Sequence, residues 1–238
     1  MTTTAGSQVS AESQVSAGSH FLLLSGGLDS ATLGSWIRDR HPGESVTAVT
    51  FLYGQKHAVE SEAAAAVATY YGFPHRLVEL PAIRGSALTD PDRPLPESRD
   101  LATVTGVAPS YVPARNLLFI AVLASLADSA GPARLWLGVH RDDHTGYPDC
   151  RPEFVAAADE AVRLGTQYGL RLEAPFVQWP KVDIVRWGLA HDVPFGLTHS
   201  CYQGLRPACG VCDTCQARLG AFEEAGVVDP IPYRGRDG

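Results

Sequence analysis

A short run of small and polar residues near the start of the chain has the composition of an anion-binding loop. Four apolar residues, Phe21 to Leu24, precede Ser25-Gly26-Gly27-Leu28-Asp29-Ser30, and apolar residues at helical spacing follow. Glycine permits positive φ angles and lets a ligand come close to the backbone. A strand, a turn of small residues and a helix N-terminus bring backbone N–H groups together, and the helix dipole favours negative charge there. The stretch therefore predicts a phosphate site.

The order of residues separates this loop from the lysine-containing phosphate loop. No Lys follows the second glycine, as Gly-x-x-x-x-Gly-Lys-Ser/Thr would require. Ser-Gly-Gly-x-Asp-Ser resembles instead the PP-loop of the N-type ATP pyrophosphatases, which bind the pyrophosphate of ATP and transfer AMP to an acceptor oxygen. An ordinary strand–turn–helix connection is the alternative. From the resemblance we expect ATP to be bound by Leu24, Ser25, Gly26, Gly27, Leu28, Asp29, Ser30, Ala31, Thr32, Leu33 and Gly34.

Four cysteines near the C-terminus have the spacing of metal ligands. Cys201, Cys209, Cys212 and Cys215 are separated by seven, two and two residues. Cys-x-x-Cys places two thiolates on one turn, and four thiolates form the closed tetrahedral site of structural zinc. The run Cys-x-x-Cys-x-x-Cys also resembles an iron–sulfur pattern, which is the alternative to zinc. Because a closed site has no position for a substrate, we expect a structural ion that holds the C-terminal segment against the sheet.

The densest polar stretch of the chain runs from His140 to Arg151 and contains the fifth cysteine. Loops on a rigid scaffold often carry function, so we expect this one to face the substrate; a solvated turn is the alternative. Cys150 belongs to no pair and is either a nucleophile or a small buried residue. Further along, Lys181 opens a predicted helix, where the dipole disfavours a cation. This misfit suggests an anionic partner such as a phosphate, with a surface lysine as the alternative.

Strands and helices that would position these residues alternate along the chain. We expect strands at 21–24, 46–51, 75–80, 135–139 and 170–174, and helices at 29–37, 58–71, 117–130, 152–168 and 182–191. Such alternation predicts right-handed crossovers and a doubly wound, mainly parallel α/β sheet. Ligands of such sheets bind at the carboxyl ends of the strands. Residues 25–30, which we call the Ser25 loop, and the segment that begins at Tyr53 would lie there. Residues 81–110 show no regular pattern and form either an active-site lid or a mobile surface loop.

Length, composition and net charge indicate how many domains, which partners and which location to expect. The 238 residues fit one domain with a small appendage, which we divide into a disordered tail (1–19), an ATP-binding α/β domain (20–195) and a zinc-binding segment (196–238). A net charge of −7 argues against nucleic-acid binding, since phosphate contacts need clustered Lys and Arg. The sequence shows no membrane span and no secretory signal, and its grouped cysteines suit a reducing compartment. We therefore expect a cytoplasmic protein.

Several motifs in a fixed order resemble the 7-cyano-7-deazaguanine synthase family of the queuosine pathway. Besides the Ser25 loop, they are Tyr53-Gly54-Gln55-Lys56-His57, Val112-Pro113-Ala114-Arg115-Asn116, Gly146-Tyr147-Pro148-Asp149-Cys150-Arg151, and Cys201-Tyr202 with the later cysteines. The resemblance extends from Phe21 to Arg218. It implies that ATP adenylates the carboxylate of 7-carboxy-7-deazaguanine and that ammonia displaces AMP to give the amide. A second ATP then activates the amide oxygen, and loss of AMP leaves the nitrile.

The same resemblance, read with residue chemistry, assigns roles to polar side chains. The Ser25 loop, Lys181 and Mg²⁺ would stabilise negative charge, while Arg115 and Arg151 would pair with the substrate carboxylate. Asp143 and Asp149 would accept hydrogen bonds from the guanine-like edge or hold magnesium. We expect catalytic roles for Lys181, Arg115 and Asp143. We expect substrate contacts from Tyr53, Gln55, Lys56, His57, Asn116, Tyr147, Asp149 and Arg151. The resemblance also makes a homodimer plausible.

Two positions depart from the family pattern. An acidic residue commonly stands at the position of Arg141, and an apolar or small residue at that of His144. Both neighbour the expected substrate pocket. A related PP-loop ligase, which adenylates a different carboxylate or attaches a deazaguanine to another acceptor, is therefore the alternative function. A non-catalytic zinc module would explain the cysteines but not the Ser25 loop.

Overall fold

The computed structural model describes residues 18–55, 59–101 and 105–235, which contain one parallel sheet. Its five strands lie in the order β3-β2-β1-β4-β5. The strands are β1 (Ser19–Leu23), β2 (Ser45–Leu52), β3 (His75–Glu79), β4 (Arg134–Trp136) and β5 (Arg171–Glu173). The chain moves outward from β1 to β3, returns to the centre, and continues from β4 to β5 on the other side. The predicted doubly wound α/β fold is thereby confirmed, with its switch point between β1 and β4.

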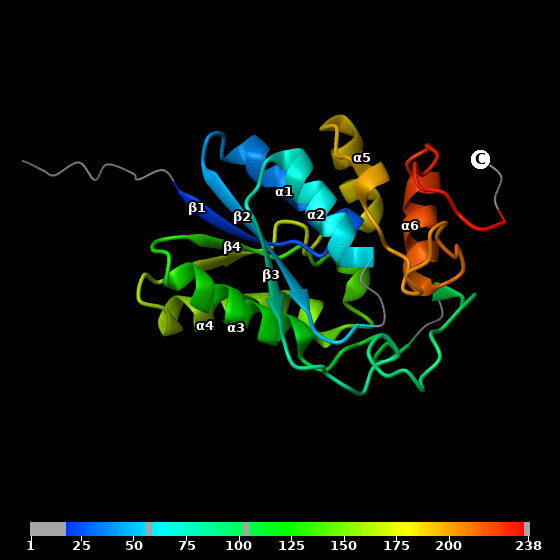
Figure 1. The fold of residues 1–238 in the computed structure, drawn as a ribbon, viewed down its shortest axis with the longest axis horizontal. Coiled ribbons are helices and arrows are strands. Elements are labelled where there is room, and N and C mark those ends of the chain that lie inside the picture. Colours follow the sequence, from blue (N-terminus) through cyan, green and yellow to red (C-terminus); the bar gives the residue numbers. More distant parts are fainter. Residues whose placement is uncertain (1–17, 56–58, 102–104, 236–238) are drawn as a thin grey trace, which may run out of the picture.

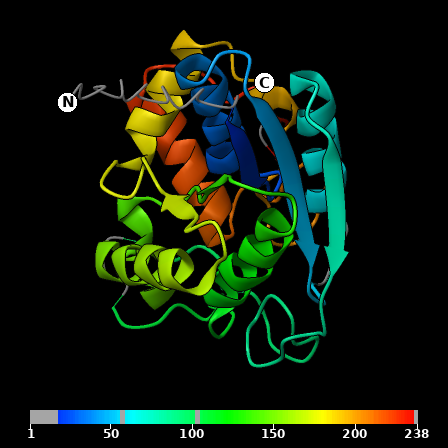
Figure 2. The ribbon, with the colours of Figure 1, turned by 90° about the vertical axis from the view of Figure 1, so that its left-hand side faces the viewer.

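Helices cover both faces of this sheet. They are α1 (Leu28–Arg40), α2 (Val59–Tyr71), α3 (Arg115–Asp128), α4 (Pro152–Gly165), α5 (Lys181–Ala190) and α6 (Asp213–Glu224). Figure 1 shows α1 and α2 on one face and α3 and α4 on the other, and the turned view in Figure 2 keeps the same layers apart. α5 packs against α1, and α6 packs against α5 at one end of the molecule. None of the helices within the described ranges has the length and apolar character that a membrane span needs.

The first strand shows why the sheet is buried on both faces. Phe21 and Leu23 belong to the core formed with α3 and α4, whereas Leu22 and Leu24 belong to the core formed with α1 and α2. All four side chains are buried. Side chains alternate between the faces of a strand, so a strand that is apolar at every position needs cover on both sides.

Each strand and helix that we predicted is present, and the ends differ by a few residues. β4 ends at Trp136, although the N–H of Leu137 still donates to the carbonyl of Glu173 at 3.0 Å. We did not predict α6. Its buried positions include Cys215 and Arg218, which an apolar pattern does not reveal.

The described parts of segment 81–110 are fastened to the rest of the molecule. The N–H of Ser98 donates to the carbonyl of Val211 at 2.8 Å, and the N–H of Ala108 donates to the carbonyl of Gly146 at 3.0 Å. Arg99 forms an ion pair with the side chain of Asp213. The segment therefore bridges the polar stretch and the cysteine-containing segment. Whether it opens as a lid stays a prediction.

Candidate active site

A cavity lies at the carboxyl ends of β1, β2 and β4, beside the switch point of the sheet. It has a volume of about 210 Å³, and its walls include the Ser25 loop, Tyr53 and Arg115. A second hollow of about 910 Å³ shares His140 and Lys181 with it and extends between α5 and α6. Ligands bind at this position in doubly wound sheets.

The Ser25 loop closes on itself through its two serines. The N–H of Ser25 donates to Oγ of Ser30 at 3.2 Å, and Oγ of Ser30 donates to the carbonyl of Gly27 at 3.2 Å. Gly26 has a φ of +86°, and a Cβ there would lie 2.3 Å from the carbonyl oxygen of Glu60, so only glycine fits. No side chain caps α1, whose N-cap is Gly27. The first N–H groups of the helix therefore retain the arrangement of an anion site.

The residues predicted to bind ATP divide into those on the cavity wall and those behind it. Five of them line the cavity: Leu24, Ser25, Gly27, Asp29 and Ser30. Gly26 shapes the turn. The others are buried within α1: Leu28, Ala31, Thr32, Leu33 and Gly34. Of these, Gly34 lets α1 approach α2, because a Cβ there would lie 3.1 Å from the ring of Tyr71. The structure thus places these five residues where they support the loop from the core.

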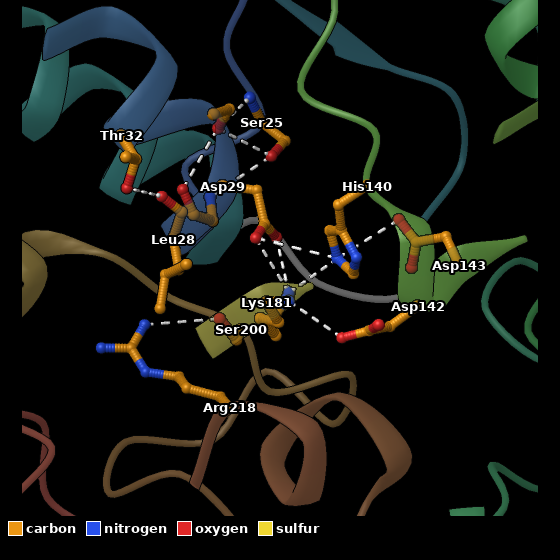
Figure 3. A network of polar contacts seen from close by, with 12 residues as sticks. Ser25, Leu28, Asp29, Thr32, His140, Asp142, Asp143, Lys181, Ser200 and Arg218 are labelled. Atoms are coloured by element: carbon orange, nitrogen blue, oxygen red, sulfur yellow. Dashed lines mark hydrogen bonds and ion pairs between the residues drawn. The ribbon is translucent and has the colours of Figure 1, made fainter. Parts of the chain in front are cut away.

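Lys181 is bound to two side chains of the cavity wall. Its Nζ lies 2.9 and 2.8 Å from the carboxylate oxygens of Asp29 and 2.9 Å from Nε2 of His140 (Figure 3). Burial acts to raise the pKa of Asp29, but the charge and hydrogen bonds of Lys181 lower that pKa below its ordinary value. The surface-lysine alternative is wrong, since the Lys181 side chain is 10% exposed. The Asp29 carboxylate is an anionic partner of this lysine.

Arg115 brings a second positive charge to the cavity wall. It begins α3 directly after Ala114, which has a φ of +51°. Its Nη1 donates to the hydroxyl of Tyr53 at 3.1 Å, and the described residues provide no carboxylate that pairs with it. Burial raises the pKa of Tyr53, so this phenol stays neutral and does not compensate the charge. A guanidinium in that setting is suited to a carboxylate or phosphate ligand.

Two tyrosine hydroxyls of the cavity wall form a chain with the hydroxyl of the buried Ser110. Oγ of Ser110 lies 2.6 Å from the hydroxyl of Tyr147, which lies 3.3 Å from the hydroxyl of Tyr202. Burial raises the pKa of both phenols, so both remain neutral and can donate or accept. The predicted residue Tyr147 therefore lies in the cavity as part of a polar chain.

Asp149 and Asn116 join the polar stretch to α3. The backbone N–H of Asn116 donates to Oδ2 of Asp149 at 2.9 Å, and its amide donates to the Asp149 carbonyl at 3.0 Å. Asn116 lines the cavity, but Asp149 is buried behind it and stabilises the first turn of α3. Burial, followed by the nearby carboxylates, raises the pKa of Cys150. Since the thiolate is the nucleophilic form, this favours the interpretation of Cys150 as a small buried residue.

Of the remaining residues predicted to contact substrate, one lies on the cavity wall and one lies on the surface. Gln55 lines the cavity and accepts a hydrogen bond from the N–H of Tyr53 at 2.8 Å. Arg151 is exposed, donates to the carbonyl of His144 at 3.0 Å, and lines neither hollow. Lys56 and His57 lie outside the described residues.

Polar residues of the cavity wall that were not among the predicted site residues include Thr50, His140, Ser200 and Tyr202. Thr50 is the last polar residue of β2, and its Oγ1 donates to the carbonyl of Leu24 at 2.5 Å. His140 belongs to the polar stretch, which was the available signal for it. Ser200 and Tyr202 arrive from the far end of the chain, and only their position beside Cys201 marks them.

The four cysteines meet at the N-terminus of α6. All are buried, and their Sγ atoms lie within 4.8 Å of one another. The Sγ atoms of Cys209 and Cys215 are 3.9 Å apart. Two thiolates bound to one ion at about 2.3 Å are about 3.8 Å apart in a tetrahedron. The N–H groups of Val211 and Cys212 donate to Sγ of Cys209 at 3.5 and 3.3 Å, as expected around a metal-bound thiolate. The donor set therefore fits a single four-coordinate metal ion.

A buried ion pair holds the metal-binding segment together, and a backbone hydrogen bond ties this segment to the Ser25 loop. Arg218 is fully buried and contacts both carboxylate oxygens of Asp229 at 2.7 and 2.8 Å. Its Nη1 also donates to Oγ1 of Thr198 at 2.6 Å. The next residue, His199, donates its N–H to the carbonyl of Gly26 at 2.9 Å. The segment therefore forms part of the cavity wall.

The fold and the site together define an α/β protein with a doubly wound parallel sheet and a polar cavity at its switch point. A loop of small residues and two cationic side chains line this cavity. A family model described as "Queuosine biosynthesis protein QueC" matches residues 19–226. The chain belongs to this family.

Relatives named 7-cyano-7-deazaguanine synthase match most of the chain. The protein of Thermosynechococcus vestitus is 44% identical over 222 residues, which cover 89% of this chain and 94% of that protein. The protein of Synechococcus sp. is 47% identical over 216 residues, covering 87% of this chain and 95% of its own length. The protein of Thermoplasma volcanium is 42% identical over 219 residues, covering 89% of each chain.

Two solved structures also match the chain. One is the U34-tRNA thiolase NcsA of Methanococcus maripaludis, with a TM-score of 0.46, 13% identity and coverage of 76% of this chain and 58% of that one. The other is the NMN synthetase of Francisella tularensis, with a TM-score of 0.47, 15% identity and coverage of 90% of this chain and 79% of that one.

Proposed function

We propose that this chain converts 7-carboxy-7-deazaguanine to 7-cyano-7-deazaguanine with ATP and ammonia, in queuosine biosynthesis. ATP adenylates the carboxylate and releases pyrophosphate, and ammonia then displaces AMP with loss of a proton to give the amide. A second ATP adenylates the amide oxygen, and departure of AMP and of the remaining N–H proton leaves the nitrile. Family membership supports this reaction. The structural observation that supports it is the Arg115 guanidinium, which shares a cavity with the Ser25 loop and has no carboxylate partner among the described residues.

The reaction requires two anions, the substrate carboxylate and the ATP phosphates, to approach each other. The Ser25 loop and the N-terminus of α1 would hold the pyrophosphate part of ATP. Lys181 would offset the charge that develops there, and Arg115 would bind the carboxylate with two hydrogen bonds. Fixing both partners in one cavity supplies the proximity that adenylation needs.

Magnesium would bind together with the ATP phosphates, which supply part of its octahedral shell. Of the carboxylates considered, Asp149 is bonded to α3 and Asp29 is bonded to Lys181. Asp143 lines both hollows, and its side chain is 30% exposed. Asp143 is therefore the residue that we assign to the ion or to the guanine-like edge of the substrate.

We also propose that the ion held by the four cysteines is zinc. Thiolates within 4.8 Å of one another suit one ion, whereas an iron–sulfur cluster places several iron atoms between its thiolates. Metal analysis of the purified protein should find one zinc per chain and no iron. Iron with visible absorption in place of zinc would refute this assignment.

The reaction is tested with purified protein, ATP, magnesium, ammonium and 7-carboxy-7-deazaguanine, followed by AMP release and product mass. We expect substrate-dependent AMP and the nitrile. Arg115→Gln should lower the rate at least about 100-fold, because the carboxylate loses its charged partner. The matched control is Arg163→Gln, on the exposed surface of α4, which should keep the wild-type rate. A folded protein that forms no substrate-dependent AMP would refute the proposed activity.

AMP release without a nitrile would point to a related ligase. Arg141 lines the second hollow, whose volume of about 910 Å³ leaves room for a larger acceptor. The same assay, repeated with candidate acceptors, separates this alternative from the nitrile-forming reaction.

A further inference from the structure

One ring nitrogen of His140 contacts both a hydrogen-bond donor and a hydrogen-bond acceptor. Its Nε2 lies 2.9 Å from Nζ of Lys181 and 3.3 Å from Oδ2 of Asp143 (Figure 3). An ammonium only donates and a carboxylate only accepts, so Nε2 can serve one of them at a time. The shorter contact is with Lys181, which requires a lone pair on Nε2. The ring proton then lies on Nδ1, which is buried and has no hydrogen-bond partner among the described residues.

The ammonium of Lys181 has three N–H groups, and three acceptor atoms surround it. Two are the carboxylate oxygens of Asp29 at 2.9 and 2.8 Å, and the third is Nε2 of His140. The other charged groups at this cluster are Asp143 and Asp142, and Oδ2 of Asp142 accepts from the backbone N–H of Lys181 at 2.9 Å. A long lysine side chain is therefore held in one conformation.

The three bonds differ in strength. Those to Asp29 join opposite charges, whereas the bond to His140 joins a cation to a neutral ring. An anion entering the cavity would replace the weaker partner first. Lys181 could then bind it through one N–H while its ion pair with Asp29 remains intact.

We propose that His140 is a positioning residue for Lys181. Its Nε2 holds the third N–H of the ammonium at the cavity wall and releases it to a phosphate oxygen of bound ATP. Only the identity of the incoming ligand rests on the proposed function. The arrangement of Lys181, Asp29 and His140 stands on the contacts themselves.

Three variants separate this role from general support of the fold. His140→Gln places an amide oxygen near the position of Nε2, so it can still accept from Lys181. His140→Asn is too short to reach that position, and His140→Leu has no acceptor. We expect His140→Gln to keep kcat for AMP formation within about fivefold of wild type. The Asn and Leu variants should lose about 10- to 100-fold in kcat, with KM for ATP changed less than about threefold.

A second readout needs no turnover. The chain contains two lysines, Lys56 and Lys181, so Lys56→Arg protein labelled with ¹⁵N-lysine has one side-chain ammonium signal. This signal should exchange slowly with water when residue 140 is His or Gln and faster when it is Asn or Leu. It should shift when α,β-methylene-ATP is added.

The comparison of Gln with Asn decides the outcome even if the Leu variant does not fold. Equal kcat and equal ammonium exchange in the Gln and Asn variants would overturn the positioning role. Failure of wild-type protein to form the nitrile would refute the proposed function, but the ammonium measurement would still test His140.

Discussion

Replacing Arg218 with methionine should destabilise the metal-binding segment and the cavity wall that it supports. The arginine side chain is fully buried and donates hydrogen bonds to Asp229 and Thr198. Methionine fills similar space but has no N–H group. The Asp229 carboxylate would then keep only the bonds from the N–H of Ile231 and the hydroxyl of Tyr233.

The expected magnitude follows from the burial of both partners. Removing one member of a buried, hydrogen-bonded ion pair costs about 3 to 5 kcal/mol, mainly because the other charge stays buried without its partner. In a chain of this length, 1 kcal/mol corresponds to about 2 to 4 °C in Tm, so Arg218→Met should lower Tm by roughly 6 to 20 °C. Adding Asp229→Leu should restore part of the loss, since no unpaired charge then remains in the core.

Urea unfolding of the two single variants and the double variant, at equal metal content, measures these free energies. The control is Arg163→Met, which removes an exposed arginine paired with Glu160 and should leave the unfolding midpoint unchanged. A loss below about 1 kcal/mol for Arg218→Met would refute the reasoning. So would a double variant less stable than either single variant.

Gly26→Ala should abolish AMP formation, because the added Cβ would lie 2.3 Å from a backbone carbonyl of the neighbouring segment. Gly43→Ala is the control, since its φ is also positive but nothing lies within 4 Å of the added atom. Cys150 should resist iodoacetamide in the folded protein, because burial raises the pKa of its thiol; prompt alkylation seen by mass spectrometry would contradict this. The folded-state pKa of Asp29 is lowered, so its stabilising ion pair is present above the ordinary Asp pKa and is lost as pH falls through the folded pKa. The difference in unfolding free energy between wild type and Asp29→Asn should therefore stay constant above about pH 5 and shrink as pH falls below the ordinary Asp pKa of about 4.

The sheet and its covering helices are predictable because their signals are local. Phe21 to Leu24 are apolar at every position, which requires burial on both faces of a strand. The Ser25 loop is likewise a contiguous motif, and its Gly26 has the positive φ that such a turn requires. In both cases the information lies within ten residues of chain.

α6 and the contacts of Lys181 could not be predicted from a local sequence pattern. Two of the positions that α6 buries are Cys215 and Arg218, whose burial depends on a metal site and on Asp229. Lys181 and Asp29 are separated by 152 positions in the sequence, so no local pattern reveals their pairing. The dipole argument correctly indicated an anionic partner for Lys181, but only the fold shows that a carboxylate from α1 supplies it.

The metal-binding segment is best understood as part of the active site. Ser200, Tyr202 and Thr214 line the cavity, and His199 donates to the carbonyl of Gly26 in the Ser25 loop. This backbone bond from another segment adds to the bonds that the two serines make within the turn. The cysteine cluster and the ion pair of Arg218 hold that segment in place, so they act on the geometry of the loop without contacting a nucleotide. A closed metal site far from the Ser25 loop in the sequence can therefore support that loop in the folded chain.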